Sequence, residues 1–394
     1  MTQLLLIQPW VEDFYATDCR IQPIGLAYLA GAVQRHFEGS IDVQIFDALA
    51  GGQKRSMPWP AEFSYLKPYY GVADRGPFRL FHQYFRFGLG DAEINERLST
   101  FTPDLIGIAA LFTPYYRQSL AMARLCRYLW PKVPIVMGGN HATMHPNSLL
   151  SPPPPFAANE ALCDFVLRGE AEQSICELLE AIRGQRSWSA VSNLVRSDHV
   201  AVAAGSLPIQ SPVEYAAPTV PDDIFTQAPS FPGLDLRHYT HGGKPMGFLI
   251  TSRSCPHRCT FCSIHAVFGK RYRTRTVDDV LSEVRRRYDD GVRHFDIEDD
   301  NFTFRREHTL ELLQGIIDLH LPIELTAMNG LSYRQYTDAD LLALMQRAGF
   351  RTLNLALVSS DDIVRRFTKR PHTLEHFHQV TQSASCLGMR IPPI

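Results

Sequence analysis

The stretch "SCPHRCTFCSIH", residues Ser254–His265, decides how the rest of the sequence is interpreted. It holds Cys255, Cys259 and Cys262 close together, while the other cysteines of the chain stand singly. Eight cysteines in 394 residues are too few and too unevenly placed for a disulfide scaffold, which favours a reducing cytoplasm. In that compartment a cluster of thiols indicates metal or redox chemistry.

The spacing of the three thiols separates two kinds of metal site. A structural zinc site needs four ligands, commonly two close pairs, and here there is one C-x3-C-x2-C group that only His257 or His265 could complete. Three thiolates suit a [4Fe–4S] cluster better, because its fourth iron then stays open for a substrate or cofactor. The loop follows an apolar run, "GFLITS", so we expect the thiolates at the carboxyl end of a strand.

Alternating strand and helix patterns follow the loop. A helix is expected over Val277–Tyr288, with Thr276 as N-cap, Gly291 just beyond its end and the basic residues 285–287 on a solvated face. Later strands are predicted in "HFDIE", "IELTAM", "TLNLALV" and the final "MRIPPI". Such units predict a (β/α) barrel with its chemistry at the carboxyl ends of the strands, but they are too few to close eight strands. We expect a partial barrel that is incomplete at the C-terminus, or a fragment.

The first half of the chain predicts a separate α/β domain. Five short apolar runs, "LLLIQ", "DVQIFD", "DLIGIAA", "PIVMGG" and "DFVLRG", alternate with helical patterns, as in a Rossmann-like, doubly wound parallel sheet. The aromatic stretch Gly51–Gly90 interrupts them and is expected to be a packed insertion. A proline-rich stretch then marks a linker. We expect a first domain over residues 1–204, a linker over 205–243 and the barrel over 244–394.

The cysteine loop resembles that of the radical S-adenosylmethionine (SAM) enzymes. The resemblance rests on the C-x3-C-x2-C spacing after the first strand and on Phe261 directly before the third cysteine. It implies that Cys255, Cys259 and Cys262 hold a [4Fe–4S] cluster whose open iron binds the amino and carboxylate groups of SAM. One-electron reduction then cleaves SAM to a 5′-deoxyadenosyl radical. The backbone at Phe261 is expected near the adenine.

The resemblance implies further SAM contacts at the later strand ends. In "FDIEDDNFTF" the group Glu298, Asp299 and Asp300 is expected to receive the SAM amino group, although capping would explain any single acid as well. Thr326 and Asn329 follow the third strand, where capping explains Asn329 equally well.

The fourth strand departs from the family pattern. Many relatives in the cobalamin-linked branch have a Glu-Ser pair where this chain has Val358 and Ser359, so the acidic side chain is missing. Ser359 stays a candidate SAM contact.

Upstream segments resemble the cobalamin-binding domain that precedes many radical SAM domains. They include "PDLIGIAALFTPYYRQSLAMARL" and "PIVMGGNHATMHP". Gly138 and Gly139 would let a large cofactor approach the backbone, and Leu111 and Thr113 are candidates for lining the corrin. His141 is expected to touch the tail of the corrin or to cap a helix. The motif Asp-x-His-x-x-Gly is absent, which implies cobalamin without a protein histidine below the cobalt.

Together these features predict a cobalamin-dependent radical SAM enzyme that methylates an unactivated carbon of a small molecule. A radical rearrangement or cyclisation without methylation, a cobalamin- or redox-responsive binding protein without turnover, and a zinc-binding structural module are the alternatives. The family implies an external one-electron donor of flavodoxin or ferredoxin type. A net charge of −2 gives no reason to expect nucleic acid, and the absence of a run of about 18 apolar residues predicts no membrane span.

Overall fold

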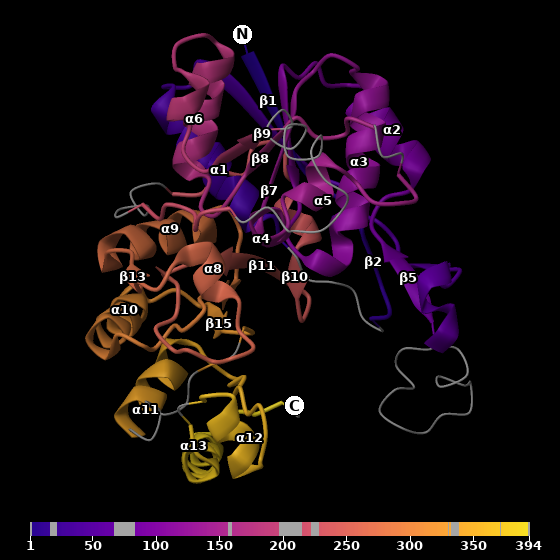
Figure 1. Ribbon diagram of the computed structural model, residues 1–394. Helices are drawn as coiled ribbons and strands as arrows, with labels where there is room; N and C mark the ends of the chain where they lie inside the picture. Colours follow the sequence, from indigo (N-terminus) through magenta and orange to yellow (C-terminus); the bar gives the residue numbers. More distant parts are fainter. Residues whose placement is uncertain are drawn as a thin grey trace. The chain divides into compact units, whose positions relative to one another are not determined.

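The computed structural model divides the chain into two compact units (Figure 1). Unit 1 comprises Met1–Pro221 and Pro229–Asp235, and unit 2 comprises Asp222–Ala228 and Leu236–Ile394. The expected boundaries after residues 204 and 243 stay predictions. The structure describes residues 2–15, 22–66, 83–156, 160–196, 215–221, 228–329, 331, 339–370 and 372–392.

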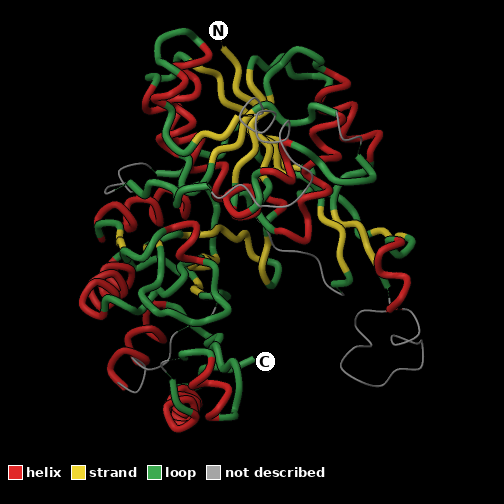
Figure 2. The backbone as a smooth tube through the Cα atoms, viewed as in Figure 1, coloured by secondary structure: helices red, strands yellow, loops and turns green. Residues whose placement is uncertain are grey.

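A mostly parallel sheet forms the centre of unit 1 (Figure 2). Its order is β3-β1-β6-β7-β8-β9, and all neighbours are parallel except β9, which runs antiparallel to β8. The five expected strands are confirmed as β1, β3, β6, β7 and β8; β9 was not predicted. The bounds are β1 (Thr2–Gln8), β3 (Ile41–Asp47), β6 (Leu105–Ala109), β7 (Ile135–Gly138), β8 (Phe165–Leu167) and β9 (Leu194–Arg196).

Helices cover both faces of this sheet. Leu4 and Leu6 of β1 pack into a core with α1 and α6, whereas Leu5 and Ile7 pack into a second core with the other helices. Successive strand residues point to opposite faces, so one strand feeds both cores. This confirms the doubly wound prediction. The helices are α1 (Ile24–His36), α2 (Asp91–Leu98), α3 (Tyr116–Leu129), α4 (Asn140–Met144), α5 (Asn147–Leu150) and α6 (Glu172–Ile182).

The described part of the aromatic insertion is packed. Phe14 meets Trp59 and Tyr84 edge-on, with ring centroids 4.9 Å away in each case. A small antiparallel sheet of order β2-β5-β4 carries these rings, while residues 67–82 lie outside the described chain. Its strands are β2 (Val11–Asp13), β4 (Arg55–Met57) and β5 (Tyr84–Phe87), and the short 3-10 helices of unit 1 are η1 (Ala61–Leu66), η3 (Thr113–Tyr115) and η4 (Trp188–Ala190).

Part of the expected linker is docked on unit 1. The backbone N–H of Ile45 in the edge strand β3 donates to the carbonyl of Pro232 at 2.9 Å, and Ser230 N donates to Ala27 O at 2.9 Å. Residues 229–235 therefore satisfy backbone groups of the sheet edge and of α1. Of the remaining expected linker, residues 205–214 and 222–227 lie outside the described chain.

Unit 2 is built on a sheet of order β10-β11-β14-β15, in which β11, β14 and β15 are parallel. The bounds are β10 (Thr240–His241), β11 (Lys244–Leu249), β14 (His294–Ile297) and β15 (Glu324–Thr326), with a separate pair of β12 (Ser252–Arg253) and β13 (Arg273–Thr274). Phe248, Asp296 and Thr326 lie side by side in register on one face. On the other face Leu249, Phe295 and Leu325 belong to the hydrophobic core.

The expected fourth and fifth strands are reduced to isolated parallel bridges. Thr352 pairs with Arg390, and Leu331 pairs with Leu355, without forming a continuous ladder. Beside the bridge at Leu355, the side chain of Asn354 donates from Nδ2 to the carbonyl of Met328 at 2.5 Å, a side-chain bond that competes with backbone pairing. The sheet therefore continues as a partial barrel with an irregular edge.

Six helices accompany this sheet within the described part of unit 2. The expected start of α9 is confirmed, because the Thr276 side chain accepts a hydrogen bond from Asp279 N. None of the helices in the described chain is both long and apolar enough to cross a membrane. The helices are α8 (Ile264–Phe268), α9 (Val277–Asp289), α10 (Arg306–Asp318), α11 (Ala339–Ala348), α12 (Asp362–Phe367) and α13 (Leu374–Cys386), with a 3-10 turn η5 (Leu236–His238).

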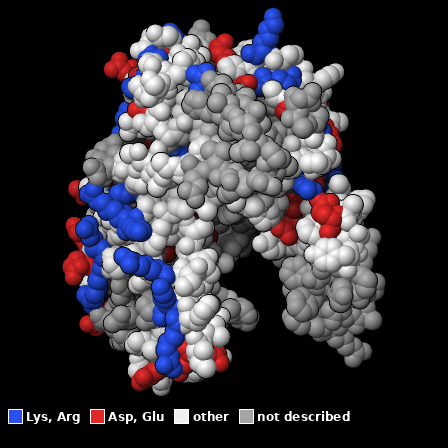
Figure 3. Space-filling model, viewed as in Figure 1, with Lys and Arg blue, Asp and Glu red and all other residues white. Residues whose placement is uncertain are grey.

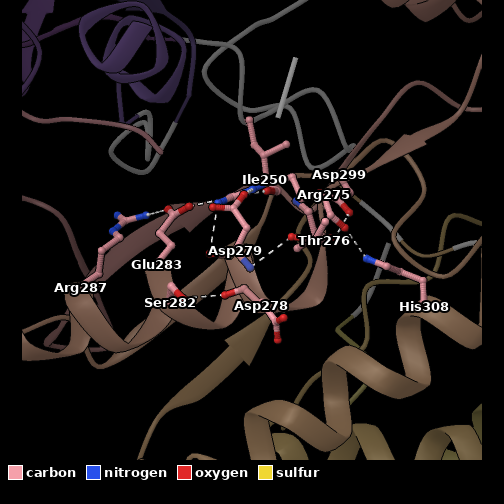
Figure 4. A network of polar contacts seen from close by, with 11 residues as sticks. Ile250, Arg275, Thr276, Asp278, Asp279, Ser282, Glu283, Arg287, Asp299 and His308 are labelled. Carbon is pink, nitrogen blue, oxygen red and sulfur yellow. Dashed lines mark hydrogen bonds and ion pairs between the residues drawn. The ribbon is translucent and has the colours of Figure 1, made fainter. Parts of the chain in front are cut away.

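A buried ionic network fastens α9 to the end of β11 (Figure 4). Glu283 lies between two arginines: its carboxylate accepts from Arg275 Nη1 at 2.6 Å and from Arg287 Nη1 at 3.2 Å. Arg275 also donates to the carbonyl of Ile250 at 3.0 Å, and Arg287 donates to the carbonyl of Phe248. The prediction of a solvated face for residues 285–287 is therefore wrong for Arg287, which turns toward the sheet and is buried.

Candidate active site

A buried carboxylate stabilises the backbone just before the cysteine loop. Asp299, just after β14, accepts hydrogen bonds from Thr251 N at 2.6 Å, Thr251 Oγ1 at 2.5 Å and Ser252 Oγ at 2.6 Å. Burial raises the pKa of Asp299, and the hydrogen bonds from Ser252 and Thr251 act in the opposite direction. The side chain of Asp299, expected among the SAM contacts, is thus engaged inside the fold and joins the ends of two strands.

Asp300 fixes the turn into the loop. Ser254 is buried and has a φ of +72°, a left-handed backbone that serine seldom adopts. Its N–H donates to Asp300 Oδ2 at 2.9 Å, and its hydroxyl donates to Gly269 O at 2.7 Å. These two bonds hold the residue that aims the chain toward Cys255.

The three thiols differ in their surroundings. Cys255 and Cys259 are half-buried, whereas Cys262 is exposed. Cys262 N donates to Cys259 O at 3.1 Å, which closes a turn. Burial raises the pKa of Cys255. Over the ranges that the structure describes, no three His, Cys, Asp or Glu side chains form a metal-binding group.

Two side chains from elsewhere reach the sulfurs. Asn301 Nδ2 donates to Cys255 Sγ at 3.5 Å, and Arg370 Nη1 donates to Cys259 Sγ at 3.6 Å. Hydrogen-bond donors facing sulfur suit thiolates that carry negative charge in a cluster. The donor set of three cysteines at a strand end therefore fits a [4Fe–4S] cluster. The contact of Arg370 was not predicted from the sequence, because the arginine follows the first cysteine by more than a hundred residues.

The two histidines near the loop have other contacts. His265 Nε2 lies 2.6 Å from the carbonyl oxygen of Cys255. The ring of His257 meets Phe304 and His372 edge-on, with ring centroids at 6.1 and 6.0 Å. The Nε2 atom of His265 therefore faces a backbone carbonyl, which differs from the arrangement of a zinc ligand.

The remaining predicted SAM residues fall into exposed and engaged groups. Phe261 is 57% exposed on the cysteine loop, and Glu298 is half-buried, with its carbonyl accepting from Asn329 Nδ2 at 3.1 Å. Thr326 is buried and donates from Oγ1 to Asp296 Oδ1 at 2.8 Å. Ser359 Oγ accepts from the backbone N–H of Asp361 at 3.1 Å and so belongs to the start of α12.

In unit 1 the glycine pair lies at the carboxyl end of β7. Gly139 has a φ of +119°, and a Cβ there would lie 2.7 Å from the carbonyl oxygen of Ala110. Gly138 differs, since a Cβ there would meet only Leu167 O at an ordinary 3.6 Å. Only Gly139 is therefore required for close backbone approach at this sheet edge.

His141 is a buried structural residue at the same edge. Its ring stacks on Tyr116 at 4.7 Å, its Nδ1 lies 3.1 Å from Thr113 Oγ1, and its Nε2 lies 2.9 Å from Ser148 Oγ. Burial, with a smaller contribution from His145, lowers the pKa of His141 to about 4. Both ring nitrogens face hydroxyl groups, which agrees with a site that has no histidine ligand for cobalt.

Exposed apolar side chains follow β6 and β7 in the sequence. Leu111, two residues after β6, is 37% exposed, and Phe112 and Met144 are each 43% exposed. Large apolar side chains left in solvent beside a close-approach glycine suit the flat, apolar flank of a corrin. Phe112 and Met144 were not predicted as site residues, although both lie within the segments that resemble a cobalamin-binding domain.

Comparison with known families assigns both halves of the chain. Residues 249–391 match the radical SAM superfamily, and residues 87–179 match the B12 binding domain. This chain belongs to the cobalamin-binding radical SAM proteins. It is accordingly an enzyme whose cofactors are a [4Fe–4S] cluster, SAM and cobalamin. A zinc module and a binding protein without turnover are not supported.

Characterised relatives of this radical SAM protein differ in their reactions. It is 26% identical to cytidylyl-2-hydroxyethylphosphonate methyltransferase of Streptomyces wedmorensis over 396 residues, covering 94% of this chain and 67% of that protein. It is 24% identical to the anaerobic magnesium-protoporphyrin IX monomethyl ester cyclase of Rubrivivax gelatinosus, covering 84% of this chain and 58% of that protein.

The fold of this radical SAM protein also resembles a solved structure. TsrM from Kitasatospora setae, a radical SAM methyltransferase with cobalamin and a [4Fe–4S] cluster bound, superimposes with a TM-score of 0.63 at 17% identity. The match covers 99% of this chain and 68% of TsrM. At this identity the likeness establishes the fold, a B12-binding sheet followed by a partial radical SAM barrel.

Proposed function

We propose that this radical SAM protein methylates an unactivated carbon of a small molecule, with cobalamin as the methyl carrier. The observation that carries the proposal is the C-x3-C-x2-C loop that follows β11 and the short β12, in a chain that also contains a B12 binding domain. The relationship to a methyltransferase over nearly the whole chain supports methylation. When bound, the cluster and SAM supply a 5′-deoxyadenosyl radical, and cobalamin supplies the methyl group.

Within unit 2 we assign separate tasks to the predicted residues. Cys255, Cys259 and Cys262 hold the cluster, and we assign the exposed Phe261 and the half-buried Glu298 to SAM. Asp299 and Asp300 orient the loop through Thr251, Ser252 and Ser254 and do not themselves touch SAM. Thr326 and Ser359 contribute through the hydrogen bonds that shape the strand ends.

Within unit 1 we assign the corrin to the edge around Gly139. Leu111, Phe112 and Met144 would pack on its apolar flank. Gly139 would support them, because the absence of a Cβ lets the backbone at Ala110 and Leu111 pack closely against β7. His141 supports this edge from below through Thr113 and does not serve as a cobalt ligand.

The second candidate is radical cyclisation without methylation. It is supported by the relationship to the magnesium-protoporphyrin monomethyl ester cyclase, whose name denotes ring closure. The product decides between the two, because only methylation adds a carbon derived from SAM.

We further propose that the electron comes from an acidic donor of flavodoxin or ferredoxin type in a reducing cytoplasm. Lys and Arg side chains gather over unit 2 (Figure 3), and charge complementarity would steer an acidic partner to such a surface. Exposed basic residues of the cysteine loop, of the turn after α8 and of the segment around α12 are Arg258, Lys270, Arg271, Arg366 and Lys369. A cluster held by three reduced thiolates suits a compartment that keeps cysteines reduced.

The first experiment measures iron, acid-labile sulfide and the electron paramagnetic resonance (EPR) spectrum of protein reconstituted without oxygen, before and after SAM is added. A four-iron cluster whose spectrum changes with SAM is the expected result. Cys259→Ala should abolish it, whereas Cys386→Ala, which removes an exposed cysteine of α13, should leave it intact. Zinc, or a cluster indifferent to SAM, would contradict the proposal.

The reaction type is tested with SAM that carries a deuterated methyl group, cobalamin, a reductant and a small-molecule extract. Methylation predicts 5′-deoxyadenosine together with a deuterium-labelled product found by mass spectrometry. Deoxyadenosine together with an unlabelled new product would favour cyclisation.

A further inference from the structure

Two side chains distant in sequence meet the sulfurs of the cysteine loop. Asn301, four residues after the end of β14, donates to Cys255 Sγ, and Arg370, three residues after α12, donates to Cys259 Sγ. Their partners are the two half-buried cysteines, while Cys262 is exposed. The contacts thus lie on the side of the loop that the protein encloses.

Asn301 is rigidly built into the fold. It is 1% exposed, and its backbone carbonyl accepts from Tyr272 Oη at 2.9 Å and from Phe304 N at 3.2 Å. Its side-chain Oδ1 is buried without a hydrogen-bond partner among the residues that the structure describes. A buried amide oxygen without a partner costs free energy. Because a thiolate only accepts hydrogen bonds, the amide gains its one observed contact by turning its NH2 group to the sulfur.

Arg370 is held in place by two further contacts of its segment. Its Nη2 donates to Ala356 O at 2.6 Å, and the nearby Thr368 O accepts from Thr260 N of the cysteine loop at 3.2 Å. The guanidinium keeps its charge at every physiological pH, so a fixed positive charge stands beside Cys259. The loop is therefore tied to this segment by backbone as well as by side chain.

Donors and positive charge at cluster sulfurs favour the reduced state. One-electron reduction makes a thiolate-bound cluster more negative, and hydrogen bonds to its sulfurs are among the features that set its potential. Resting on the function proposed above, we infer that Asn301 and Arg370 raise the reduction potential of the [4Fe–4S] cluster. The electron comes from the external one-electron donor, and the two residues make its transfer to the cluster less unfavourable.

The test is a redox titration of the reconstituted protein, with the reduced cluster counted by EPR and without SAM. Asn301→Leu and Arg370→Met should each move the midpoint potential to more negative values. A lost hydrogen bond to a charged group corresponds to about a tenfold smaller equilibrium constant for reduction. Arg370→Lys, which keeps the charge, should recover part of the shift. Arg351→Met, which removes an exposed arginine elsewhere in unit 2, is the matched control and should not move the midpoint.

The outcomes separate this inference from the proposed function. Variants that carry four irons and titrate like the wild type would overturn the inference and leave the function standing. A wild-type protein that assembles no cluster would overturn the function itself. If Leu at position 301 prevents cluster loading, Asn301→Asp takes its place: it keeps the shape, adds negative charge and must lower the midpoint.

Discussion

Asp299 concentrates three hydrogen bonds on one buried carboxylate at the start of the cysteine loop. Asp299→Ala would leave Thr251 and Ser252 with buried donors that have lost their acceptor, and each such group costs about 1–3 kcal/mol. We expect the free energy of unfolding to fall by about 3 kcal/mol, measured by urea denaturation of the protein without cofactors.

Asp278→Ala is the control for that measurement. Asp278 lies exposed in the first turn of α9, where a carboxylate contributes about 0.5 kcal/mol through the helix dipole. A loss at Asp299 no larger than the loss at Asp278 would show that the three hydrogen bonds do not stabilise the fold.

His141 should make unit 1 sensitive to acid. Its pKa is lowered to about 4 by burial, whereas an unfolded histidine titrates near about 6.5. Between these values the unfolded chain binds the proton and the folded chain does not. Stability is therefore full above about pH 6.5 and is lost as the pH falls toward 4.

His141→Gln tests this dependence, since glutamine hydrogen-bonds to hydroxyls without titrating. The melting temperature of the variant should change less than that of the wild type between pH 7 and pH 5. Parallel curves for the two proteins would mean that His141 is already protonated in the folded state or is not buried in solution.

For single residues, the sequence predicted which side chains would lie near the site better than it predicted what each side chain does there. The spacing of Cys255, Cys259 and Cys262 singled out the residues that we propose as cluster ligands, but the acids 298–300 could only be taken as a group. Adjacent residues at a strand end point in different directions, and only the fold shows that Asp299 turns inward while Asp300 turns to Ser254. Arg370 carried no signal, because nothing local in the sequence reports a contact across the fold.

Among the helices and strands, the packing of α9 depends on a group of buried charged side chains. Glu283 is enclosed by Arg275 and Arg287, and removing one partner of such a network leaves uncompensated buried charge. We expect Glu283→Ala to lower the free energy of unfolding by about 3–5 kcal/mol in a denaturant titration.

The matched control for this helix is Glu307→Ala, at an exposed position in the first turn of α10, which should change stability by less than about 1 kcal/mol. Equal effects at the two positions would mean that the arginines find other partners or water.

The sequence placed the helices of unit 2 more reliably than its later strands. Thr276 marked the start of α9 through its capping chemistry, which acts within one turn and is therefore legible locally. The segment from Thr352 had the composition of a strand but forms only isolated bridges, since its pairing depends on distant residues and on the side chain of Asn354. For the same reason the sequence did not predict that Arg287 is buried, since its burial depends on contacts with distant residues.

For the whole molecule, the division into two units predicts that the protein can lose either the iron–sulfur cluster or cobalamin without losing the other. The cysteines lie in unit 2 and the close-approach Gly139 lies in unit 1. Cys259→Ala should lose iron and keep cobalamin, measured by its visible absorbance after gel filtration. Gly139→Val should lose cobalamin, because any Cβ there collides with Ala110 O, and should keep its iron.

Loss of both cofactors in both variants would contradict this separation. Wild-type protein treated with an iron chelator is the control, since it should release iron while its cobalamin absorbance persists.

The order of the two domains was predictable because the alternation of strands and helices is a long-range pattern with many repeats. Their limits were less predictable. Residues 229–235 have the prolines of a linker, yet they pair with the edge of β3, a fact that composition alone does not reveal.

The hydrogen bonds that Asp299 accepts at the start of the cysteine loop have a consequence for how the protein matures. Small zinc domains fold only when the metal arrives, because the metal supplies their stability. Here the start of the cysteine loop is stabilised by hydrogen bonds between the Asp299 carboxylate, two hydroxyls and a backbone amide. All of these groups belong to the polypeptide itself and need no metal. The newly made chain should therefore fold before any iron is delivered. The exposed Cys262 would then be accessible to proteins that insert the cluster. Cluster insertion can thus follow folding at a later time.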